Sequence, residues 1–431
     1  MPTTLADWLG HIERQHPQAI EMGLDRVRAV ADALALPRPA PRVVTVAGTN
    51  GKGSTVAFLE AIAREAGLRV GTYTSPHLLA YGERVRIDGA QAGEAELVEA
   101  FAAVESARGT TPLTYFEFGT LAALWLFARA GLDLAILEVG LGGRLDATNL
   151  VDADVAVITT VDLDHQDWLG EDREAIGAEK AGIARAWRPL VLGDDDPPAS
   201  VLRHAYAIGA SALRIGCDFF FEPVDDARWR WREVGCELDL PMPALAAPVQ
   251  LRNAAVAIAA LRALDLDLPE AAFAAGVASA RLDGRLQRFE RGGVAIAVDV
   301  GHNPQAARAL AAWLRSSPAP GRTHVVYAAL ADKDVVAVAG AFDGLVDAWW
   351  LGGSLGAGAR GLGVDGLAQR LHGAGILPVG RSPDPAAALA AALQAAAAGD
   401  RVLVFGSFHA AEEALRALRG PGSEAAARRV V

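Results

Sequence analysis

The stretch Val43 to Thr55 reads VVTVAGTNGKGST, a β-branched run that breaks into a glycine-rich turn. The run predicts a buried strand. The turn predicts a phosphate-binding loop, because glycines let backbone N–H groups face an anion at a helix N-terminus. Lys52 would then reach the outer phosphates, although Gly53 separates it from Ser54, where the general P-loop has the hydroxyl directly after the lysine. A plain glycine-rich turn of an α/β domain is the alternative interpretation.

The segments around this loop predict an α/β fold. A periodic stretch over 56–64 predicts the helix that a phosphate loop requires, and 68–73 resembles the next strand. Three apolar runs are expected to form a mainly parallel sheet with helices on both faces: 43–47, 134–139 and 155–160. The segments 48–54, 138–149 and 162–168 should therefore converge, because ligands bind at the carboxyl ends of such strands.

A second α/β alternation begins near residue 285. It comprises an expected strand at 294–300, a helix at 304–314 and strands at 324–328 and 401–405. We therefore expect two domains, residues 1–284 with the phosphate loop and residues 285–431 as a smaller doubly wound domain. The stretch 189–248 has many turn residues and little helical periodicity, which predicts hairpins that add to the first domain and carry no assigned function.

Composition excludes several classes of partner. The 431 residues include 40 basic and 52 acidic side chains, a net charge of −12, which argues against nucleic acid or an anionic membrane as the main partner. The sequence has no apolar run long enough to span a bilayer, and early charges interrupt any signal peptide. Two cysteines cannot build a disulfide framework, so a reduced cytoplasmic setting is expected.

Glu138 lies at the expected carboxyl end of a buried strand in ILEVGLGGRLDATN. An unpaired buried carboxylate is costly, so either an ion pair with Arg144 or a metal role would account for it. Beside a phosphate loop the metal role is favoured, because Mg²⁺ prefers carboxylate, hydroxyl and phosphate oxygens and needs few protein ligands.

The turn TVDLDHQDWLG, residues 160–170, gathers Asp162, Asp164, His165 and Asp167 at the end of another expected strand. A solvated acidic turn with a hydrogen-bonded histidine is the alternative to a functional site. Its location at a strand end favours the functional interpretation.

Taken together, motifs along nearly the whole chain resemble the folylpolyglutamate synthase family of ATP-dependent amide ligases, relatives of the Mur peptidoglycan ligases, and most closely its bifunctional bacterial members. The motifs are GTNGKGST, SPHL, TYFEFGTLAAL, LEVGLGGRLDATN, DLDHQDWLG, EKAGI, LRNAAVAIAAL, GRLQ, DVGHNP, ADKD and FGSFH. The resemblance implies a Mur-ligase-like P-loop ATPase domain with a mainly parallel sheet, followed by a smaller Rossmann-like α/β domain that serves as the glutamate ligase domain.

The resemblance also implies functional residues. It places ATP on Thr49, Asn50, Gly51, Lys52, Gly53 and Ser54, with further nucleotide contacts from Asn253, Arg285 and Asp299. It places two Mg²⁺ ions on Ser75, Glu138, His165 and Lys180. It places the pterin on Met22, Gly23, Leu24, Thr114, Tyr115, Phe116, Glu117, Leu145, Asp146 and Ala147. The expected catalytic residues are Lys52, Lys180, Asp299 and His302.

Lys180 matches a lysine that CO₂ converts to a metal-binding carbamate in this family. Carbamylation needs a neutral amine, so burial or nearby cations must lower the pKa of this lysine.

The implied reaction joins L-glutamate to dihydropteroate and to the γ-carboxylate of reduced folates, through an acyl phosphate made with ATP. Folylpolyglutamate synthase activity alone is one alternative. A Mur ligase acting on a UDP-linked sugar is another alternative. It is disfavoured because such enzymes carry a substantial nucleotide-sugar domain ahead of the phosphate loop, whereas Gly48 follows only 47 residues. A P-loop regulatory NTPase would hydrolyse ATP without an acceptor, and a non-catalytic binding protein would leave the metal set unexplained. We expect a cytoplasmic monomer.

Overall fold

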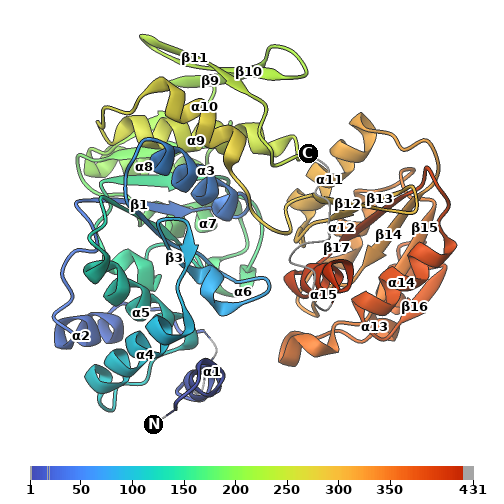
Figure 1. Cartoon of the computed structure of the whole chain (residues 1–431), viewed down its shortest axis with the longest axis horizontal. Coiled ribbons are helices and arrows are strands. Elements are labelled where there is room, and N and C mark those ends of the chain that lie inside the picture. The colour runs from blue at the N-terminus through green and yellow to red at the C-terminus, as the bar shows by residue number, and fades with distance from the viewer. Residues whose placement is uncertain (1, 17, 19, 421–431) are drawn as a thin grey trace. The chain divides into compact units, whose positions relative to one another are not determined.

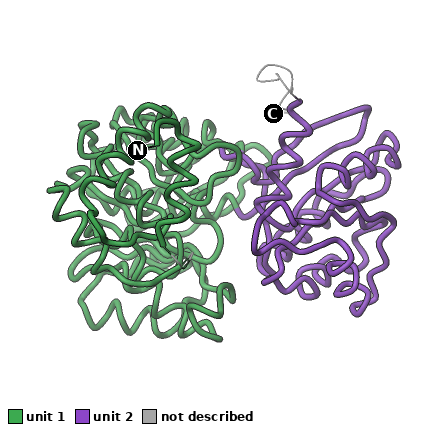
Figure 2. The backbone as a smooth tube through the Cα atoms, turned by 90° about the horizontal axis from the view of Figure 1, so that it is seen from below, with its two compact units in different colours: residues 1–244, 250–281 green, residues 245–249, 282–431 purple. Residues whose placement is uncertain are grey.

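The computed structural model describes residues 2–16, 18 and 20–420. The chain divides into two compact units, shown in different colours in Figure 2. The first unit contains residues 1–244 and 250–281, and the second contains residues 245–249 and 282–431. Residues 245–249, which the sequence places in the first domain, thus belong to the second unit.

The first unit is built on a sheet with strand order β4-β3-β2-β5-β1-β6-β7-β8. Its strands are β1 (Arg42–Ala47), β2 (Val70–Tyr73), β3 (Val85–Ile87), β4 (Ala90–Gln91), β5 (Leu134–Glu138), β6 (Val155–Ile158), β7 (Pro189–Leu192) and β8 (Ser211–Arg214). Neighbours from β2 to β8 pair in parallel, while β3 and β4 pair antiparallel at one edge. The predicted mainly parallel α/β sheet is confirmed.

Helices cover both faces of this sheet. They are α1 (Leu5–Glu13), α2 (Asp25–Ala33), α3 (Lys52–Glu65), α4 (Glu94–Arg108), α5 (Tyr115–Ala130), α6 (Gln166–Leu169), α7 (Arg173–Ala181), α8 (Ala199–Ile208), α9 (Val249–Ala263) and α10 (Glu270–Ser279), with short 3₁₀ turns η1 (Tyr81–Arg84) and η2 (Ala147–Leu150). Helix α3 packs with α10, and α5 packs with α4 on the other side of β1 (Figure 1). All of α5 between residues 117 and 127 is buried, which explains its nearly continuous apolar sequence.

Residues 189–248 correct one expectation. Their first part, β7–α8–β8, extends the main sheet by parallel pairing, and only the rest forms antiparallel hairpins: β9 (Phe219–Pro223), β10 (Arg228–Glu233) and β11 (Cys236–Pro241). Helix α8 escapes prediction because it spans only 10 residues and directly follows the turn residues 193–198, GDDDPP; Val201 and Ala205 are its buried residues. In β10, Trp229 and Trp231 are fully buried on one face, next to Phe219 and Phe221.

The second unit contains a sheet with strand order β12-β13-β17-β14-β15-β16, parallel except for β12. Its strands are β12 (Gln287–Arg291), β13 (Val294–Val298), β14 (Thr323–Tyr327), β15 (Ala348–Gly352), β16 (Gly380–Ser382) and β17 (Arg401–Phe405). Its helices are α11 (Pro304–Ser316), α12 (Val335–Gly340), α13 (Val364–His372), α14 (Pro385–Ala395) and α15 (Phe408–Arg419), with the 3₁₀ segment η3 (Leu355–Arg360). The predicted smaller α/β domain is confirmed.

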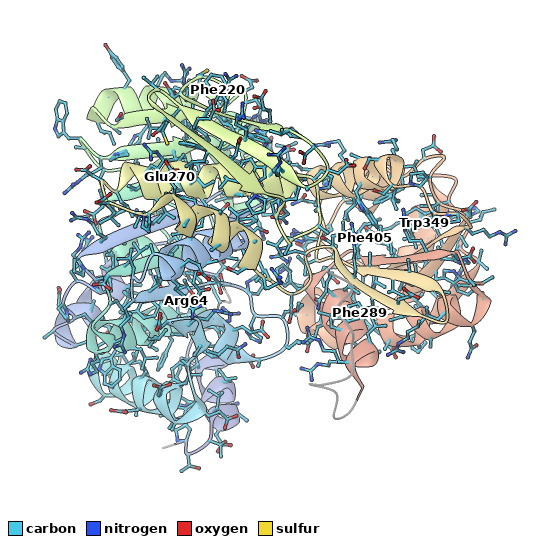
Figure 3. The ribbon with its side chains drawn as sticks, turned by 45° about the horizontal axis from the view of Figure 1, so that its top comes forward. Arg64, Phe220, Glu270, Phe289, Trp349 and Phe405 are labelled. Carbon is cyan, nitrogen blue, oxygen red and sulfur yellow. The ribbon has the colours of Figure 1, made fainter. Side chains whose placement is uncertain are left out.

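An aromatic cluster forms part of the core of the second unit. Phe405 lies with its ring centroid 4.9 Å from that of Phe342 and 5.0 Å from that of Tyr327. Trp349 meets both Tyr327 and Phe342 edge-on. Figure 3 labels Phe405 and Trp349 among the side chains of this unit. These rings join three parallel strands to the turn after α12, which keeps the carboxyl ends of the strands in a fixed arrangement.

Within the described residues, no helix combines the length and the apolar character that crossing a bilayer requires.

Candidate active site

The loop between β1 and α3 is a tight cradle that requires glycine at two positions. Gly48 has a φ of 152°, and a Cβ there would lie 1.9 Å from Oγ1 of Thr159. Gly51 caps α3 with a φ of 87°, and a Cβ there would lie 2.6 Å from Oδ1 of Asn253. The structure thus brings Asn253, a predicted nucleotide contact, against the cradle. Neither position accepts a side chain without displacing its neighbour.

Helix α3 begins at Lys52, four residues before the start that periodicity predicts. Gly53 and Ser54 consequently lie in its first turn, so Gly53 does not help to turn the loop as the sequence suggests. The ammonium of Lys52 donates hydrogen bonds to the carbonyls of Gly48, at 2.9 Å, and Thr49, at 3.3 Å. This folds the lysine back over the cradle, where backbone N–H groups of a helix N-terminus favour an anion.

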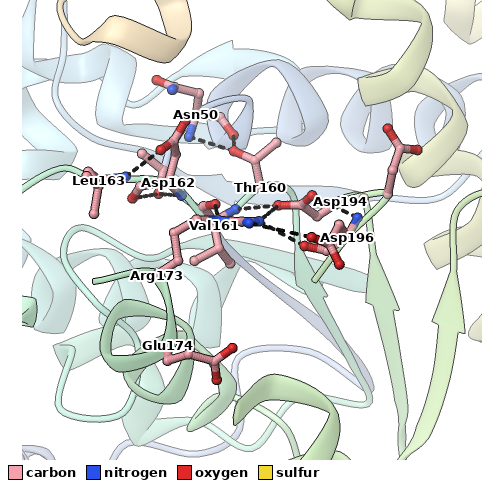
Figure 4. A network of polar contacts seen from close by, with 12 residues as sticks. Asn50, Thr160, Val161, Asp162, Leu163, Arg173, Glu174, Asp194 and Asp196 are labelled. Carbon is pink, nitrogen blue, oxygen red and sulfur yellow. Dashed lines mark hydrogen bonds and ion pairs between the residues drawn. The ribbon is translucent and has the colours of Figure 1, made fainter. Parts of the chain in front are cut away.

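The cradle is fixed to the loop that follows β6 (Figure 4). The backbone N–H of Thr49 donates to the carbonyl of Thr160 at 2.8 Å, and Asn50 N–H donates to the Thr160 hydroxyl at 3.2 Å. The Thr49 hydroxyl donates to the carbonyl of Asp162 and accepts from its N–H, both at 3.0 Å. The two strand-end loops therefore converge, as the sequence predicts.

A second layer of contacts holds the β6 loop in place. Arg173, at the start of α7, donates to the carbonyl of Val161 at 2.9 Å and to the carboxylate of Asp194 at 3.2 Å. Asp194 also accepts from the Val161 N–H at 3.1 Å (Figure 4). The ends of β1, β6 and β7 thus form one hydrogen-bonded edge, which positions the cradle before any ligand arrives.

Glu138 lies at the carboxyl end of β5, beside β1, and is only 4% exposed. Its carboxylate accepts a hydrogen bond from the backbone N–H of Ser75 at 3.2 Å, so two predicted metal ligands are in contact. Arg144 pairs with Glu179 at 2.8 Å, which removes it as the counter-ion that the sequence offered for Glu138. A carboxylate and a serine beside a predicted phosphate cradle fit the oxygen ligands that Mg²⁺ prefers.

The other predicted metal residues occupy constrained positions. His165 has a left-handed backbone with a φ of 52° and caps α6, and its N–H donates to the Asp164 carboxylate at 2.9 Å. Asp162 similarly accepts from the N–H of Leu163 at 2.8 Å. In the part of the chain that the structure describes, no group of three or more His, Cys, Asp and Glu side chains is placed as a metal site.

Lys180, in the last turn of α7, is 3% exposed. Burial, followed by the positive charge of Lys52, lowers its pKa to about 7, while the carboxylates of Asp164 and Asp146 act in the opposite direction. The structure therefore places Lys180 within electrostatic reach of the cradle lysine and of the acidic turn. The lowered pKa provides the neutral amine that carbamylation requires.

Three predicted pterin residues meet at the glycine turn after β5. A Cβ on Gly140 would lie 2.7 Å from the ring of Phe116, and one on Gly142 would lie 3.4 Å from Cε of Met22. The carboxylate of Asp146 accepts from the N–H of Gly140 at 3.0 Å and is fully engaged by its own loop. Burial raises the pKa of Asp146. Because these contacts determine the path of the turn, Asp146 has at least a positioning role.

The remaining predicted pterin residues lie in the segment before α2, at the start of α5 and within the loop itself. Gly23 and Leu24 lead into α2, with Leu24 as its N-cap, and Ala147 is buried in the same core as α5. Thr114 and Glu117 form the capping box of α5: Glu117 N–H donates to the Thr114 hydroxyl at 3.3 Å, and Thr114 N–H donates to the Glu117 carboxylate at 2.8 Å. Burial raises the pKa of Tyr115 to about 12. Leu145 is half-buried within the loop.

Comparison with known proteins decides the family. The Mur ligase middle domain matches residues 46–261, and the Mur ligase glutamate ligase domain matches residues 284–408. The chain is 46% identical to the dihydrofolate synthase/folylpolyglutamate synthase of Escherichia coli K12, over 94% of this chain and 93% of that protein. The chain belongs to this family of Mur ligases. The family predicted from the sequence is confirmed.

Solved structures of the family are similar over almost the whole chain. The Escherichia coli FolC protein in complex with DHPP and ADP has a TM-score of 0.90 at 45% identity, covering 96% of this chain and 98% of that one. A bifunctional folylpolyglutamate synthase/dihydrofolate synthase with Mn, AMPPNP and L-glutamate bound has a TM-score of 0.89 at 44% identity, covering 97% and 98%. These relatives bind adenine nucleotides, and one of them binds a divalent metal and glutamate.

Three residues of the second unit that the family resemblance assigns to the nucleotide cluster together. The Asp299 carboxylate accepts from the N–H groups of Gly301, at 2.7 Å, and Leu286, at 2.8 Å, and burial raises its pKa. The Arg285 guanidinium lies 5.5 Å from the ring centroid of Phe408. The ring centroid of His302 lies 6.3 Å from the same Phe408 centroid. Phe408, at the start of α15, thus contacts both Arg285 and His302. The motif FGSFH, which contains Phe408, did not reveal this role.

Arg84 is a candidate site residue that the sequence did not indicate. It is 8% exposed, and its guanidinium lies 5.5 Å from the ring centroid of Tyr81 and 5.4 Å from that of Tyr115. Its Nε donates to Nδ1 of His77 at 2.8 Å. The carboxylate of the neighbouring acid, Glu83, accepts hydrogen bonds from the backbone N–H groups of residues 78–80 instead. Buried cations are normally paired with an acid, so the burial of Arg84 indicates a role beyond the surface.

Glu117 offers a test of how the pterin segment is held together. Its carboxylate both completes the α5 capping box and accepts from Arg26, at the start of α2, at 2.8 Å. We expect Glu117→Ala to lower the free energy of unfolding by about 2 kcal/mol, because it removes a cap and a charged hydrogen bond. Chemical denaturation measures this loss. Glu99→Ala, which removes an exposed acid of α4, is the control, and an equal loss there would contradict the assignment.

Proposed function

We propose that this chain joins L-glutamate to dihydropteroate, forming dihydrofolate, and joins further glutamate to the γ-carboxylate of reduced folates. Membership of the family makes it an ATP-dependent glutamate ligase, as the sequence predicts. The observation that carries the site assignment is the buried Lys180 beside the Lys52 cradle, with Glu138 and Ser75 in contact at the neighbouring strand end. We propose an acyl phosphate as the intermediate.

In this reaction the carboxylate of the acceptor attacks the γ-phosphate of ATP, which releases ADP and leaves an acyl phosphate. The amine of glutamate then attacks the activated carbonyl, forms the amide and expels phosphate. Such phosphoryl transfer requires positioning and charge neutralisation from the protein. The cradle at residues 48–54 would position the phosphates through its N–H groups, and Lys52 would neutralise charge on the outer phosphates.

We propose Ser75, Glu138, His165 and Lys180 as ligands of two Mg²⁺ ions, with Lys180 carbamylated. When bound, such ions neutralise phosphate charge and orient the transferred group. The carbamate would turn a buried cation into an anion, which suits a site that holds divalent cations and nucleotide. This fits the lowered pKa of Lys180, since a neutral amine can add CO₂.

The pterin site is proposed around the turn 140–147. The supporting contacts are those of Phe116 with Gly140, of Met22 with Gly142, and of Asp146 with the turn backbone. In the second unit we propose that Arg285, Asp299 and His302 contribute to nucleotide binding. We further propose a cytoplasmic monomer.

Release of ADP under defined mixtures tests the function. The protein with ATP, Mg²⁺ and L-glutamate should release ADP only when dihydropteroate or tetrahydrofolate is added. Turnover with both acceptors indicates both activities, and turnover with tetrahydrofolate alone indicates folylpolyglutamate synthase activity only. ADP release without any acceptor would support a regulatory NTPase and refute the ligase. A UDP-linked sugar in place of the acceptors is the control for a Mur-type reaction and should be inactive.

A further inference from the structure

Arg84 lies in the first unit, and no carboxylate of the described residues pairs with its guanidinium. Among the described residues, its contacts are the hydrogen bond to His77 and the faces of Tyr81 and Tyr115. The nearest acid in sequence, Glu83, is already engaged, because its carboxylate accepts from the N–H groups of Leu78, Leu79 and Ala80 at 2.6, 2.7 and 2.8 Å. A guanidinium that is 8% exposed and has no counter-ion in the described part of the chain is suited to an anionic ligand.

The hydrogen bond to His77 determines the orientation of this guanidinium. Arginine can only donate, so Nδ1 of His77 must be the unprotonated ring nitrogen that accepts from Nε at 2.8 Å. The rings of Tyr81 and Tyr115 have their centroids 5.5 and 5.4 Å from the guanidinium carbon and 6.0 Å from each other, so they flank the group from one side. With Nε occupied and the two rings on one side, the terminal Nη nitrogens remain to bind a ligand, and their paired N–H groups match the two oxygens of a carboxylate.

The neighbours of this pair identify the class of ligand. His77 follows Ser75 by two residues in the loop after β2, and Ser75 contacts Glu138 at the proposed metal site. Tyr115 belongs to the proposed pterin segment. Arg84 therefore lies between the groups proposed to hold the metal and those proposed to hold the acceptor. Both organic substrates of the proposed reaction, the folate acceptor and L-glutamate, carry carboxylates.

We propose that His77 is a positioning residue, which uses Nδ1 to aim the Arg84 guanidinium at a carboxylate of the acceptor or of L-glutamate. This inference rests on the proposed ligase function. The imidazole itself does not touch the reacting atoms. It acts only through Arg84, so an acceptor atom at the position of Nδ1 should be sufficient.

Two substitutions of similar size separate this role from a purely structural one. The side-chain oxygen of asparagine can occupy the place of Nδ1, while that of glutamine extends to the place of Nε2. We expect His77→Gln and His77→Leu to raise the KM for the folate acceptor or for L-glutamate about tenfold, the effect of losing one charged hydrogen bond. His77→Asn should keep both KM values within about threefold of the wild-type value. The KM for ATP and the Mg²⁺ concentration for half-maximal activity should not change.

The coupling of His77 to Arg84 provides the second measurement. Arg84→Lys should raise the same KM, and adding His77→Gln to it should have no further effect. Arg86→Lys is the matched control, because Arg86 lies on β3 and pairs with Glu60. Separate titration of acceptor and glutamate shows which carboxylate Arg84 binds.

The proposal is overturned if His77→Asn is as impaired as His77→Gln, if the two losses add, or if only the ATP or Mg²⁺ dependence changes. An inactive wild-type protein would instead refute the ligase assignment, and thermal unfolding verifies that each variant is folded.

Discussion

Lys180→Ala should reduce the rate of glutamate ligation by about 10²–10³-fold, the range for losing one group that stabilises charge in the transition state. The reason is that the variant cannot form the proposed carbamate, which would leave the proposed metal site without an anionic ligand from α7. A short carboxylate such as formate or acetate should partly restore the rate, because it can supply anionic oxygens in the space vacated by the side chain. Steady-state ADP release with and without the additive measures both effects.

Lys180→Arg serves as the matched control. It keeps a cation of similar length, but its guanidinium does not become a carbamate, so it should be inactive and should not respond to the carboxylate. Unchanged turnover of Lys180→Ala without any additive would overturn the carbamate proposal. Equal rescue of both variants would indicate that the additive acts elsewhere.

The strand, glycine turn and helix of the cradle could be predicted from the sequence because their determinants are local. A β-branched run, a glycine turn and a following helix are contiguous, and their order along the chain leaves one sensible arrangement. The convergence of the loops after β1, β5 and β6 was equally predictable, because parallel strands present their carboxyl ends at one edge. The hydrogen bonds between Thr49 and Asp162 show that convergence in detail.

Other features depend on contacts between distant segments and leave no local signal. Arg84 follows Glu83 directly, so the sequence suggests a solvated pair of opposite charges. In the structure, Glu83 binds the backbone of residues 78–80, and Arg84 turns to His77. In the same way, the pairing of Arg144 with Glu179 depends on the packing of α7 against the glycine turn. No residue spacing in the sequence encodes either choice of partner.

The helix start at Lys52 illustrates a third limit. Gly53 and Ser54 have weak helix propensity, so the periodic pattern becomes visible only after them. The helix begins earlier because Gly51 adopts the left-handed conformation of a cap, and Asn253 of α9 packs against it. Tertiary packing thus overrides local propensity at the residues that are predicted to bind phosphate.

Lys52→Met should impair the enzyme in two separable ways. It removes the cation proposed to neutralise the outer phosphates, so kcat/KM for ATP should fall about 10²–10³-fold. It also removes the charge that, after burial, contributes most to lowering the pKa of Lys180 from 10.5 to about 7. The pKa of Lys180 should therefore rise in the variant, which leaves less neutral amine at a given pH.

The sign of this second effect makes it measurable. A lysine with a pKa near 7 is largely neutral above pH 7, so the wild-type protein should bind CO₂ increasingly as the pH rises through that value. In Lys52→Met the same rise should occur at higher pH. The carbamate signal in ¹³C NMR with labelled bicarbonate reports it without any turnover. Arg64→Met is the control, because it removes a cation from the same helix that pairs with Asp88. An unshifted carbamate profile in Lys52→Met would show that burial alone makes Lys180 neutral, and the cradle lysine would then act only on the phosphates.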